Sequence, residues 1–327
     1  MRPQHPPRPP LAIPQVIPRK RGRRSAKDVV ARPFRCTRYG WWNPIMKHTF
    51  FDVPALECKC CKEKCPLDFD FNLCGITVNL HKIFGHILDQ GNSELCEAFA
   101  FAKIMEMTKK IQYLMLAKDP TLIRSLNPFH LFDQYKIMLG GVPATGGTDQ
   151  TILMAMALKE LGIMDNCKST IYRASNVSTI SRNDQQAIVS ALANGFPLHA
   201  TILQGTKLTF LRYCTSYEPP DFFQALKVRA PEDIPCHAIV LVGAVKKKGK
   251  LSYYFLNAWK RFCARRSEDG TLLAYGIGKV NANRLYRNVI KVSRFKEAPN
   301  ERSFTQNMKL NTALLVGDLP KREPTFR

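Results

Sequence analysis

Residues 89–102, with the sequence Asp-Gln-Gly-Asn-Ser-Glu-Leu-Cys-Glu-Ala-Phe-Ala-Phe-Ala, join a polar amide, a tight turn and a helix that starts at a cysteine. Gln90 stands six residues before Cys96, and apolar spacing predicts a helix from Cys96 to about Met115. Unpaired N–H groups and a partial positive charge at a helix N-terminus push a thiol toward thiolate. The stretch therefore predicts a nucleophilic cysteine. The predicted water-facing side of the helix carries Lys103, Glu106, Lys109 and Lys110.

A base and a residue to orient it are expected far downstream. His237 opens the apolar, β-branched run of residues 236–243, which predicts a buried strand. A Lys/Gly turn follows over residues 246–250, and residues 251–259 read as the returning strand, which ends in Asn257-Ala258-Trp259. On such a hairpin His237 and Asn257 lie side by side. The sequence thus offers a nucleophile, a base and a group that holds the base.

Taken together, these residues resemble the papain-like cysteine peptidases. In that family Gln-Gly and Cys-Trp-Ala-Phe are separated by four residues, His-Ala then opens a Val-Gly strand, and Asn-Ser-Trp-Gly follows. His237 lies 141 residues after Cys96 (237 − 96), within the family's span of roughly 130–150 residues. Weaker similarities lie at residues 126–133, at Gly146-Gly147 with the helix expected over 151–161, and at residues 184–203. The resemblance covers about residues 66–290.

The resemblance implies an α+β fold of two lobes, a helical lobe and an antiparallel β-barrel-like lobe, with the catalytic cleft between them. Four segments are expected along the chain. They are a basic Pro/Arg-rich disordered arm over 1–50, a Cys-rich segment over 51–65, the peptidase domain over 66–295 and a basic tail over 296–327.

The resemblance also implies a mechanism for hydrolysing a peptide or protein substrate. Cys96 would attack the scissile carbonyl, and His237 would hold the ion pair and protonate the leaving amine. Asn257 would orient the imidazole, while Gln90 and the Cys96 N–H would bind the oxyanion. No cofactor or metal is implied for this site.

Several residues around these four depart from the family pattern. Glu97 replaces the tryptophan after the nucleophile, and its charge would disfavour the thiolate unless Lys260 or Arg261 neutralised it. Lys260 follows Trp259, and the family's second tryptophan has no clear counterpart. Two functions therefore stand: a thiol peptidase with an altered cleft, or a catalytically inactive papain-like homologue that acts as a binding protein.

The chain is strongly basic, with a formal net charge of +23 at pH 7. Residues 18–24, Pro-Arg-Lys-Arg-Gly-Arg-Arg, have the density of a nuclear-localisation signal or of an arm that contacts nucleic acid. A field of this sign favours nonspecific contact with nucleic acid or acidic proteins through the arm. The alternatives are a solvated tail or an organelle transit peptide.

No apolar run is long enough to span a membrane, and no signal-peptide pattern follows the first charges. The positions that match the family's disulfide cysteines are Ser93, Gln134 and Thr145, which fits a reducing compartment. We expect a nuclear or cytoplasmic protein, while the family resemblance alone would imply a lysosomal, vacuolar or extracellular one.

Residues 58–74 hold five of the eleven cysteines: Cys58, Cys60, Cys61, Cys65 and Cys74. Their spacing, C-x-C-C-x3-C, lacks the paired CxxC motifs of a strong zinc signal, and His48 and His81 are not at ligand intervals. A reduced, solvent-facing loop is the favoured interpretation, and a structural metal site is the alternative.

Overall fold

The computed structural model describes residues 34–43, 51, 53–78, 81–82, 88–91, 93–116, 118–140, 148–168, 170–209, 211, 215–227, 229, 234–259, 265–266, 272–274 and 276–299. Most of the expected basic arm, Thr145, Gly146-Gly147, Lys260, Arg261 and nearly all of the C-terminal tail therefore lie outside the described residues. Among the helices of the described part, none combines the length and apolarity that a membrane span needs.

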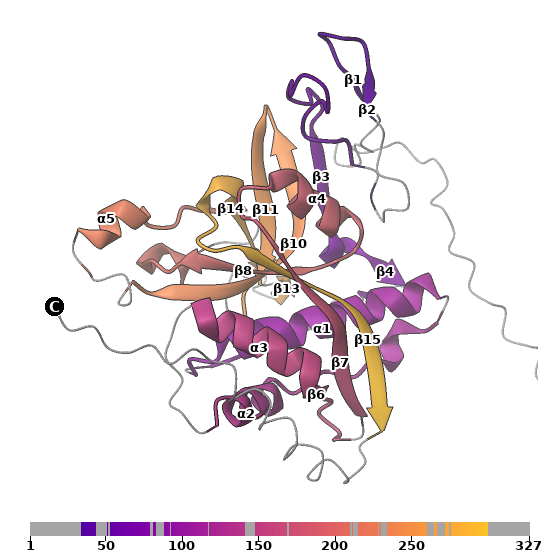
Figure 1. Ribbon diagram of the computed structural model, residues 1–327, viewed down its shortest axis with the longest axis vertical. Helices are drawn as coiled ribbons and strands as arrows, with labels where there is room; N and C mark the ends of the chain where they lie inside the picture. Colours follow the sequence, from indigo (N-terminus) through magenta and orange to yellow (C-terminus); the bar gives the residue numbers. More distant parts are fainter. Residues whose placement is uncertain are drawn as a thin grey trace, which may run out of the picture.

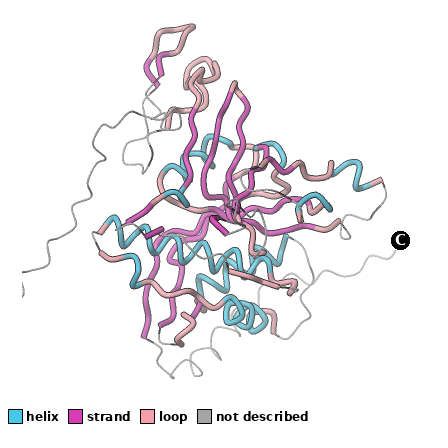
Figure 2. Tube along the Cα trace, turned by 180° about the vertical axis from the view of Figure 1, so that it is seen from behind, coloured by secondary structure: helices cyan, strands magenta, loops and turns pink. Residues whose placement is uncertain are grey.

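Three helices gather on one side of the molecule: α1 (Cys96–Met115), α2 (Pro128–Met138) and α3 (Thr148–Glu160). Figure 2 shows the same division from behind, with these helices in the lower half. α2 begins where Asn127 accepts hydrogen bonds from the N–H groups of the first turn and Pro128 fixes the first helical residue. α1 starts at Cys96 as predicted, and no side chain caps it.

A nine-stranded sheet forms the rest of the framework. Its order is β6-β7-β15-β8-β10-β11-β14-β9, with β3 paired to β10 off this path. The strands are β3 (Phe69–Asn72), β6 (Ile163–Met164), β7 (Thr170–Ile180), β8 (Leu198–Leu203), β9 (Ser216–Tyr217), β10 (Cys236–Lys247), β11 (Lys250–Leu256), β14 (Ile277–Asn281) and β15 (Val289–Pro299). All neighbours are antiparallel except β14 and β9. The α+β class is thus confirmed, but the described strands do not close into the expected barrel.

The remaining elements are short. They are β1 (Phe34–Arg35), β2 (Trp42–Asn43), β4 (Thr77–Val78), β5 (His81–Lys82), α4 (Gln185–Ala193), α5 (Phe222–Leu226), β12 (Arg265–Arg266) and β13 (Leu272–Ala274), with short 3₁₀ turns between them. β1 and β2 pair as a hairpin inside the segment that the sequence predicted to be disordered, and Phe34 and Cys36 there are buried. The arm predicted over residues 1–50 is therefore too long.

β10 is the centre of the molecule, because both of its faces are buried. One face, including Ala238 and Val240, packs with α1 in the first hydrophobic core. The other face, including Ile239 and Leu241, packs with α4 in the second core. A strand that is buried on both faces consists of consecutive apolar residues, and the apolar run 236–243 predicts a buried strand for this reason.

Burial on both sides of the sheet also corrects the prediction for α1. Lys103 and Glu106 were expected to face water, yet their side chains are only 5% and 2% exposed. Lys103 Nζ lies 3.3 Å from Glu106 Oε1, and Lys110 Nζ lies 2.6 Å from the same oxygen. The helix was predicted correctly, but the charged face is a buried ion-pair cluster, because buried charges require partners.

Candidate active site

The predicted hairpin brings His237 and Asn257 together. β10 and β11 pair from Val240–Leu256 to Lys247–Lys250, with a shift in register between Leu241 and Gly243. Lys248 and Gly249 make the turn with φ of +49° and +75°. His237 Nε2 lies 2.6 Å from Asn257 Oδ1, and both side chains are buried. An amide oxygen in this position fixes the ring orientation and favours a proton on Nε2. Nδ1 is then left as the basic nitrogen, and it makes no hydrogen bond to the described residues.

Trp259 covers this pair. Its ring centroid lies 4.6 Å from that of His237, at an interplanar angle of 34°. The tryptophan of the Asn257-Ala258-Trp259 segment therefore packs on the imidazole that Asn257 orients. Burial lowers the pKa of His237, although the Asn257 hydrogen bond and the charge of Glu97 act in the opposite direction. The imidazole is neutral at neutral pH.

Cys96 lies against the start of β10, where the N–H of Ala238 points at its sulfur. Burial and, after it, the neighbouring Glu97 charge raise the pKa of the Cys96 thiol to about 11, against the lowering effect of nearby backbone N–H groups. The predicted thiolate is therefore wrong for the resting protein. No hydrogen bond joins Cys96 to His237, although both residues are described.

Gln90 lies beside Asn257, because its backbone N–H donates to the carbonyl of Ala258 at 2.8 Å. Its side chain folds back into the predicted turn, where Nε2 donates to the Ser93 carbonyl at 2.8 Å. Gly91 closes the turn with φ of +56°, a conformation that favours glycine. One of the two amide N–H groups of Gln90 is thus occupied within the turn.

Glu97 is buried and held by residues that the sequence analysis did not identify. Thr151 Oγ1 of α3 donates to Oε1 at 2.9 Å, and His199 Nε2 of β8 lies 2.6 Å from Oε2, at ion-pair distance but without hydrogen-bond geometry. His199 is fully buried and stacks on Phe101 at 4.7 Å between ring centroids.

The environment of Glu97 keeps it ionised. Burial pushes the Glu97 pKa up, but His199, Thr151 and the positive charge of Arg287 outweigh it and leave the pKa below its ordinary value. The partner expected from the sequence, Lys260 or Arg261, lies outside the described residues. The signal that was missed is His199 itself, since a histidine inside the apolar run 196–203 needs a buried partner.

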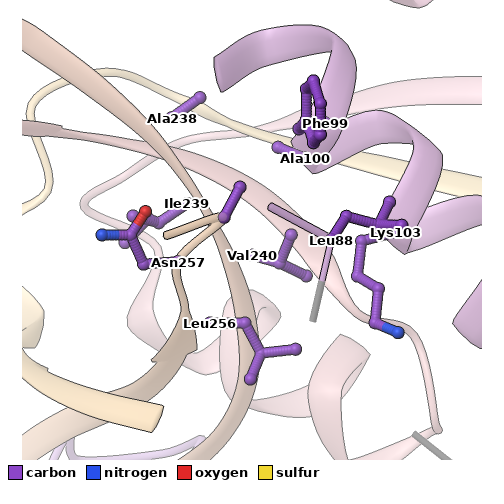
Figure 3. Close-up of a pocket in the computed structure, with 10 residues that line it drawn as sticks. Leu88, Phe99, Ala100, Lys103, Ala238, Ile239, Val240, Leu256 and Asn257 are labelled. Atoms are coloured by element: carbon purple, nitrogen blue, oxygen red, sulfur yellow. The ribbon is translucent and has the colours of Figure 1, made fainter. Parts of the chain in front are cut away.

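Two hollows border these residues. The first lies between α1 and the β10–β11 hairpin, and Figure 3 shows Asn257 and Lys103 on opposite sides of it. Its volume of about 10 Å³ is at most that of one water molecule, so it cannot hold a peptide. The second, of about 440 Å³, is open and lined in part by Thr151, Phe222 and Arg287. It borders the Glu97 cluster.

Comparisons with known proteins were made by sequence and by structure. No protein-family model matches the chain. No curated protein sequence matches it either. Digestive procathepsin L 3 of the Tenebrio molitor larval midgut matches at 15% identity and a TM-score of 0.49, over 73% of this chain and 74% of that chain.

Two further solved structures match at similar levels. A structure from a study of the mite allergens Blo t 1 and Der p 1 matches at 14% identity and a TM-score of 0.47, over 73% of this chain and 75% of that one. ProCathepsin B S9 from Trypanosoma congolense matches at 14% identity and a TM-score of 0.42, over 71% and 77%. These neighbours are papain-like proteins, the family that the sequence motifs resemble.

Proposed function

We propose that the chain is a papain-like cysteine peptidase that cleaves peptide bonds by acyl transfer at Cys96. The observation that carries the proposal is the buried His237–Asn257 pair under Trp259, joined by a thiol that contacts the backbone N–H directly after His237. A buried imidazole oriented by an amide, beside a thiol at a helix start, is the arrangement that nucleophilic catalysis by cysteine requires.

The chemistry starts from a neutral thiol and a neutral imidazole. When a peptide enters, the Cys96 proton passes to Nδ1 of His237, and the sulfur forms a bond with the scissile carbonyl carbon. The C–N bond then breaks, and the imidazolium gives its proton to the leaving amine. A water molecule, deprotonated by His237, hydrolyses the thioester and regenerates the thiol. Asn257 keeps Nε2 occupied throughout, so that Nδ1 is the nitrogen that moves protons.

Two N–H groups support this reaction as oxyanion donors. One is the backbone N–H of Cys96 in the first turn of α1, and the other is the second amide N–H of Gln90. A preorganised donor of this kind is worth about 2.7–4 kcal/mol in the transition state.

The second candidate function is a papain-like binding protein without turnover. The raised pKa of Cys96, the missing Cys96–His237 hydrogen bond and the Gln90 amide bonded to Ser93 favour it. The two candidates differ in one property: only a peptidase needs Cys96 to become more reactive than the other thiols when a peptide-like ligand lies against it.

Covalent labelling with an epoxide inhibitor of papain-like peptidases, read by intact mass, tests the proposal. We expect one adduct, lost in Cys96→Ala and strongly reduced in His237→Ala. Cys236→Ala is the matched control, because Cys236 is a partly buried thiol directly before His237 and has no assigned role. If Cys96 reacts no faster than the remaining thiols, the peptidase proposal fails and the binding protein stands.

A further inference from the structure

Two turns near the N-terminal end of the described chain have the same hydrogen-bond pattern. In the first, the Cys36 carbonyl accepts from the N–H of Gly40 and the Cys36 N–H donates to Trp41, both at 2.8 Å. In the second, the Cys58 carbonyl accepts from the N–H of Lys62 at 3.0 Å, and the Cys58 N–H donates to Glu63 at 2.7 Å. In each turn the backbone of the cysteine is thus hydrogen-bonded to the residues four and five positions after it.

The backbone angles of the two turns agree as well. Gly40 has φ of +69° and Lys62 has φ of +61°, and each stands four residues after the cysteine that begins its turn. Positive φ is uncommon for lysine, so its presence indicates that the turn shape is imposed by the contacts of this unit. The N–H groups of Cys60 and Cys61 also point at the Cys58 sulfur, as donors that stabilise a thiolate.

The two turns bring three thiols together. The sulfur atoms of Cys36, Cys58 and Cys61 all lie within 4.8 Å of one another, and Cys36 and Cys61 are 3.3 Å apart. Cys36 and Cys58 are buried, Cys61 is partly buried, and all three are free thiols. Tetrahedral zinc with Zn–S bonds of about 2.3 Å separates its sulfur ligands by about 3.8 Å. The three sulfurs reach that spacing with small shifts.

The unit around these thiols lacks a core that would hold it together by packing. Its buried apolar cluster is small, consisting of Phe34, Cys36, Ala55, Cys58 and Cys65. Figure 1 shows the β1–β2 hairpin at one end of the molecule, beyond β3 and away from the helices. A direct link between β2 and the second turn is the side chain of Asn43, whose Oδ1 accepts from the N–H of Lys59 at 3.1 Å. Units with so little apolar burial usually depend on a metal or disulfides.

We propose that Cys36, Cys58 and Cys61 bind one zinc ion, which holds the β1–β2 hairpin to the turn at residues 58–63. Thiolate sulfur selects zinc over magnesium or calcium. In the second turn Cys61 is the ligand three residues after Cys58. The equivalent residue of the first turn is Tyr39, whose side chain is 56% exposed. The fourth coordination position therefore lies on the Tyr39 side and is open to solvent.

The interpretation of the cysteine segment as a solvent-facing loop is wrong, because Cys58 and Cys65 are buried. Cys58 and Cys61 are a C-x2-C pair that the intervening Cys60 obscured. The sequence showed no second pair, because the upstream turn contributes one cysteine and a tyrosine. Of the two histidines considered, His48 lies outside the described residues and His81 stands in β5.

Cobalt titration of the reduced full-length protein tests the proposal, because cobalt bound tetrahedrally by thiolates absorbs visible light. We expect one equivalent of Co²⁺ to bind, to be displaced by Zn²⁺, and to be lost in Cys58→Ser and Cys61→Ser. Cys60→Ser is the matched control and should retain binding, because Cys60 is exposed and outside the cluster. Tyr39→Cys should complete a four-cysteine site and tighten zinc at least about tenfold, or about 1.4 kcal/mol.

Three results would overturn the proposal: no cobalt signal from the reduced wild-type protein, equal loss of binding in Cys60→Ser and Cys61→Ser, or a Cys36–Cys61 disulfide whose reduction restores no metal binding. If the serine variants fail to fold, the wild-type protein decides the matter. Its bound zinc, measured after purification, should be about one per chain, and a chelator should lower the melting temperature. A melting temperature that the chelator leaves unchanged would count against a structural role.

Discussion

The environment of Cys96 shows how two local effects on a thiol compare in size. A rise of its pKa from an ordinary value near 9 to about 11 corresponds to about 3 kcal/mol against the thiolate. A helix N-terminus contributes roughly 0.3–1 kcal/mol in the other direction. The sequence revealed the helix start but not the burial. The prediction of a thiolate therefore failed at the resting state, even though the position of the helix was right.

The pH dependence of Cys96 reactivity follows directly. With iodoacetamide and no peptide ligand, the rate of Cys96 alkylation should rise about tenfold per pH unit between pH 7 and 10, because only the thiolate reacts. Peptide mapping by mass spectrometry measures it, with Cys167, which is exposed, as the internal reference. A rate that is already constant at pH 6–7 would mean that a thiolate–imidazolium pair exists in the free protein.

Glu97→Gln should have two separable effects. Removing the charge next to Cys96 lowers the pKa of the thiol, so alkylation at pH 8 should become several-fold faster. The variant should also lose about 3 kcal/mol of stability, because His199 and Thr151 lose a buried ionised partner. Glu94→Gln, an exposed change in the same segment, is the control for both measurements.

The pH dependence of the stability of the wild-type protein should also reflect the ionisation of Glu97. The pKa of Glu97 is lower in the folded protein than in the unfolded chain, so its ionisation stabilises the fold above the unfolded pKa of about 4.3. This contribution is lost as the pH falls through the folded-state pKa. Urea unfolding between pH 3 and 6 should therefore depend less steeply on pH in Glu97→Gln. Parallel curves for the two proteins would contradict the ionised Glu97.

Among the secondary-structure elements, the β10–β11 hairpin could be predicted from the sequence and the contacts of β10 with β3 and β8 could not. The hairpin is local, with apolar runs on both sides of a Lys-Gly turn. The pairing of β10 with β3 joins residues far apart in sequence, and it occurs at a point where the register between Leu241 and Gly243 shifts. The contact between His199 and Glu97 was not predictable either, because β8 and the start of α1 are far apart in the sequence.

Gly243 is the residue that the β3–β10 pairing requires. A Cβ at this position would overlap the carbonyl oxygen of Phe71 and come within 2.8 Å of the Asn72 Cα. Both are backbone atoms, so the strands must separate to make room. Gly243→Ala should destabilise the protein by about 1–3 kcal/mol in urea unfolding. Gly75→Ala is the matched control, because nothing lies within 4 Å of the Cβ it would add; equal stability of the two variants would contradict the close approach.

Across the whole molecule, the periodicity of apolar residues predicted the helices and the α+β class. It did not predict which faces of these helices are covered by other segments. α1 was expected to have a charged, wet side. Instead the described strands β10, β8 and β15 and the helices α2 and α3 all contact α1, and its charges are buried among them. The pattern of charges along a helix cannot predict this burial, because it contains no information about which segments, distant in the sequence, pack against the helix.

The Glu106 cluster on α1 offers a test of this burial. Glu106→Leu removes the carboxylate that lies 3.3 Å from the buried ammonium of Lys103, so it should cost about 3–5 kcal/mol in chemical denaturation. Lys103→Met together with Glu106→Leu should recover most of the loss, because the charge and its partner are removed together.

The control is the pair Lys136–Asp133 on α2, which has the same i,i+3 spacing. Its charged atoms lie 2.7 Å apart, but both side chains are more than half exposed. Asp133→Leu should therefore cost at most about 1 kcal/mol. If Glu106→Leu is as mild as Asp133→Leu, then this side of α1 is not buried as described, and the packing that positions Cys96 against β10 must be different.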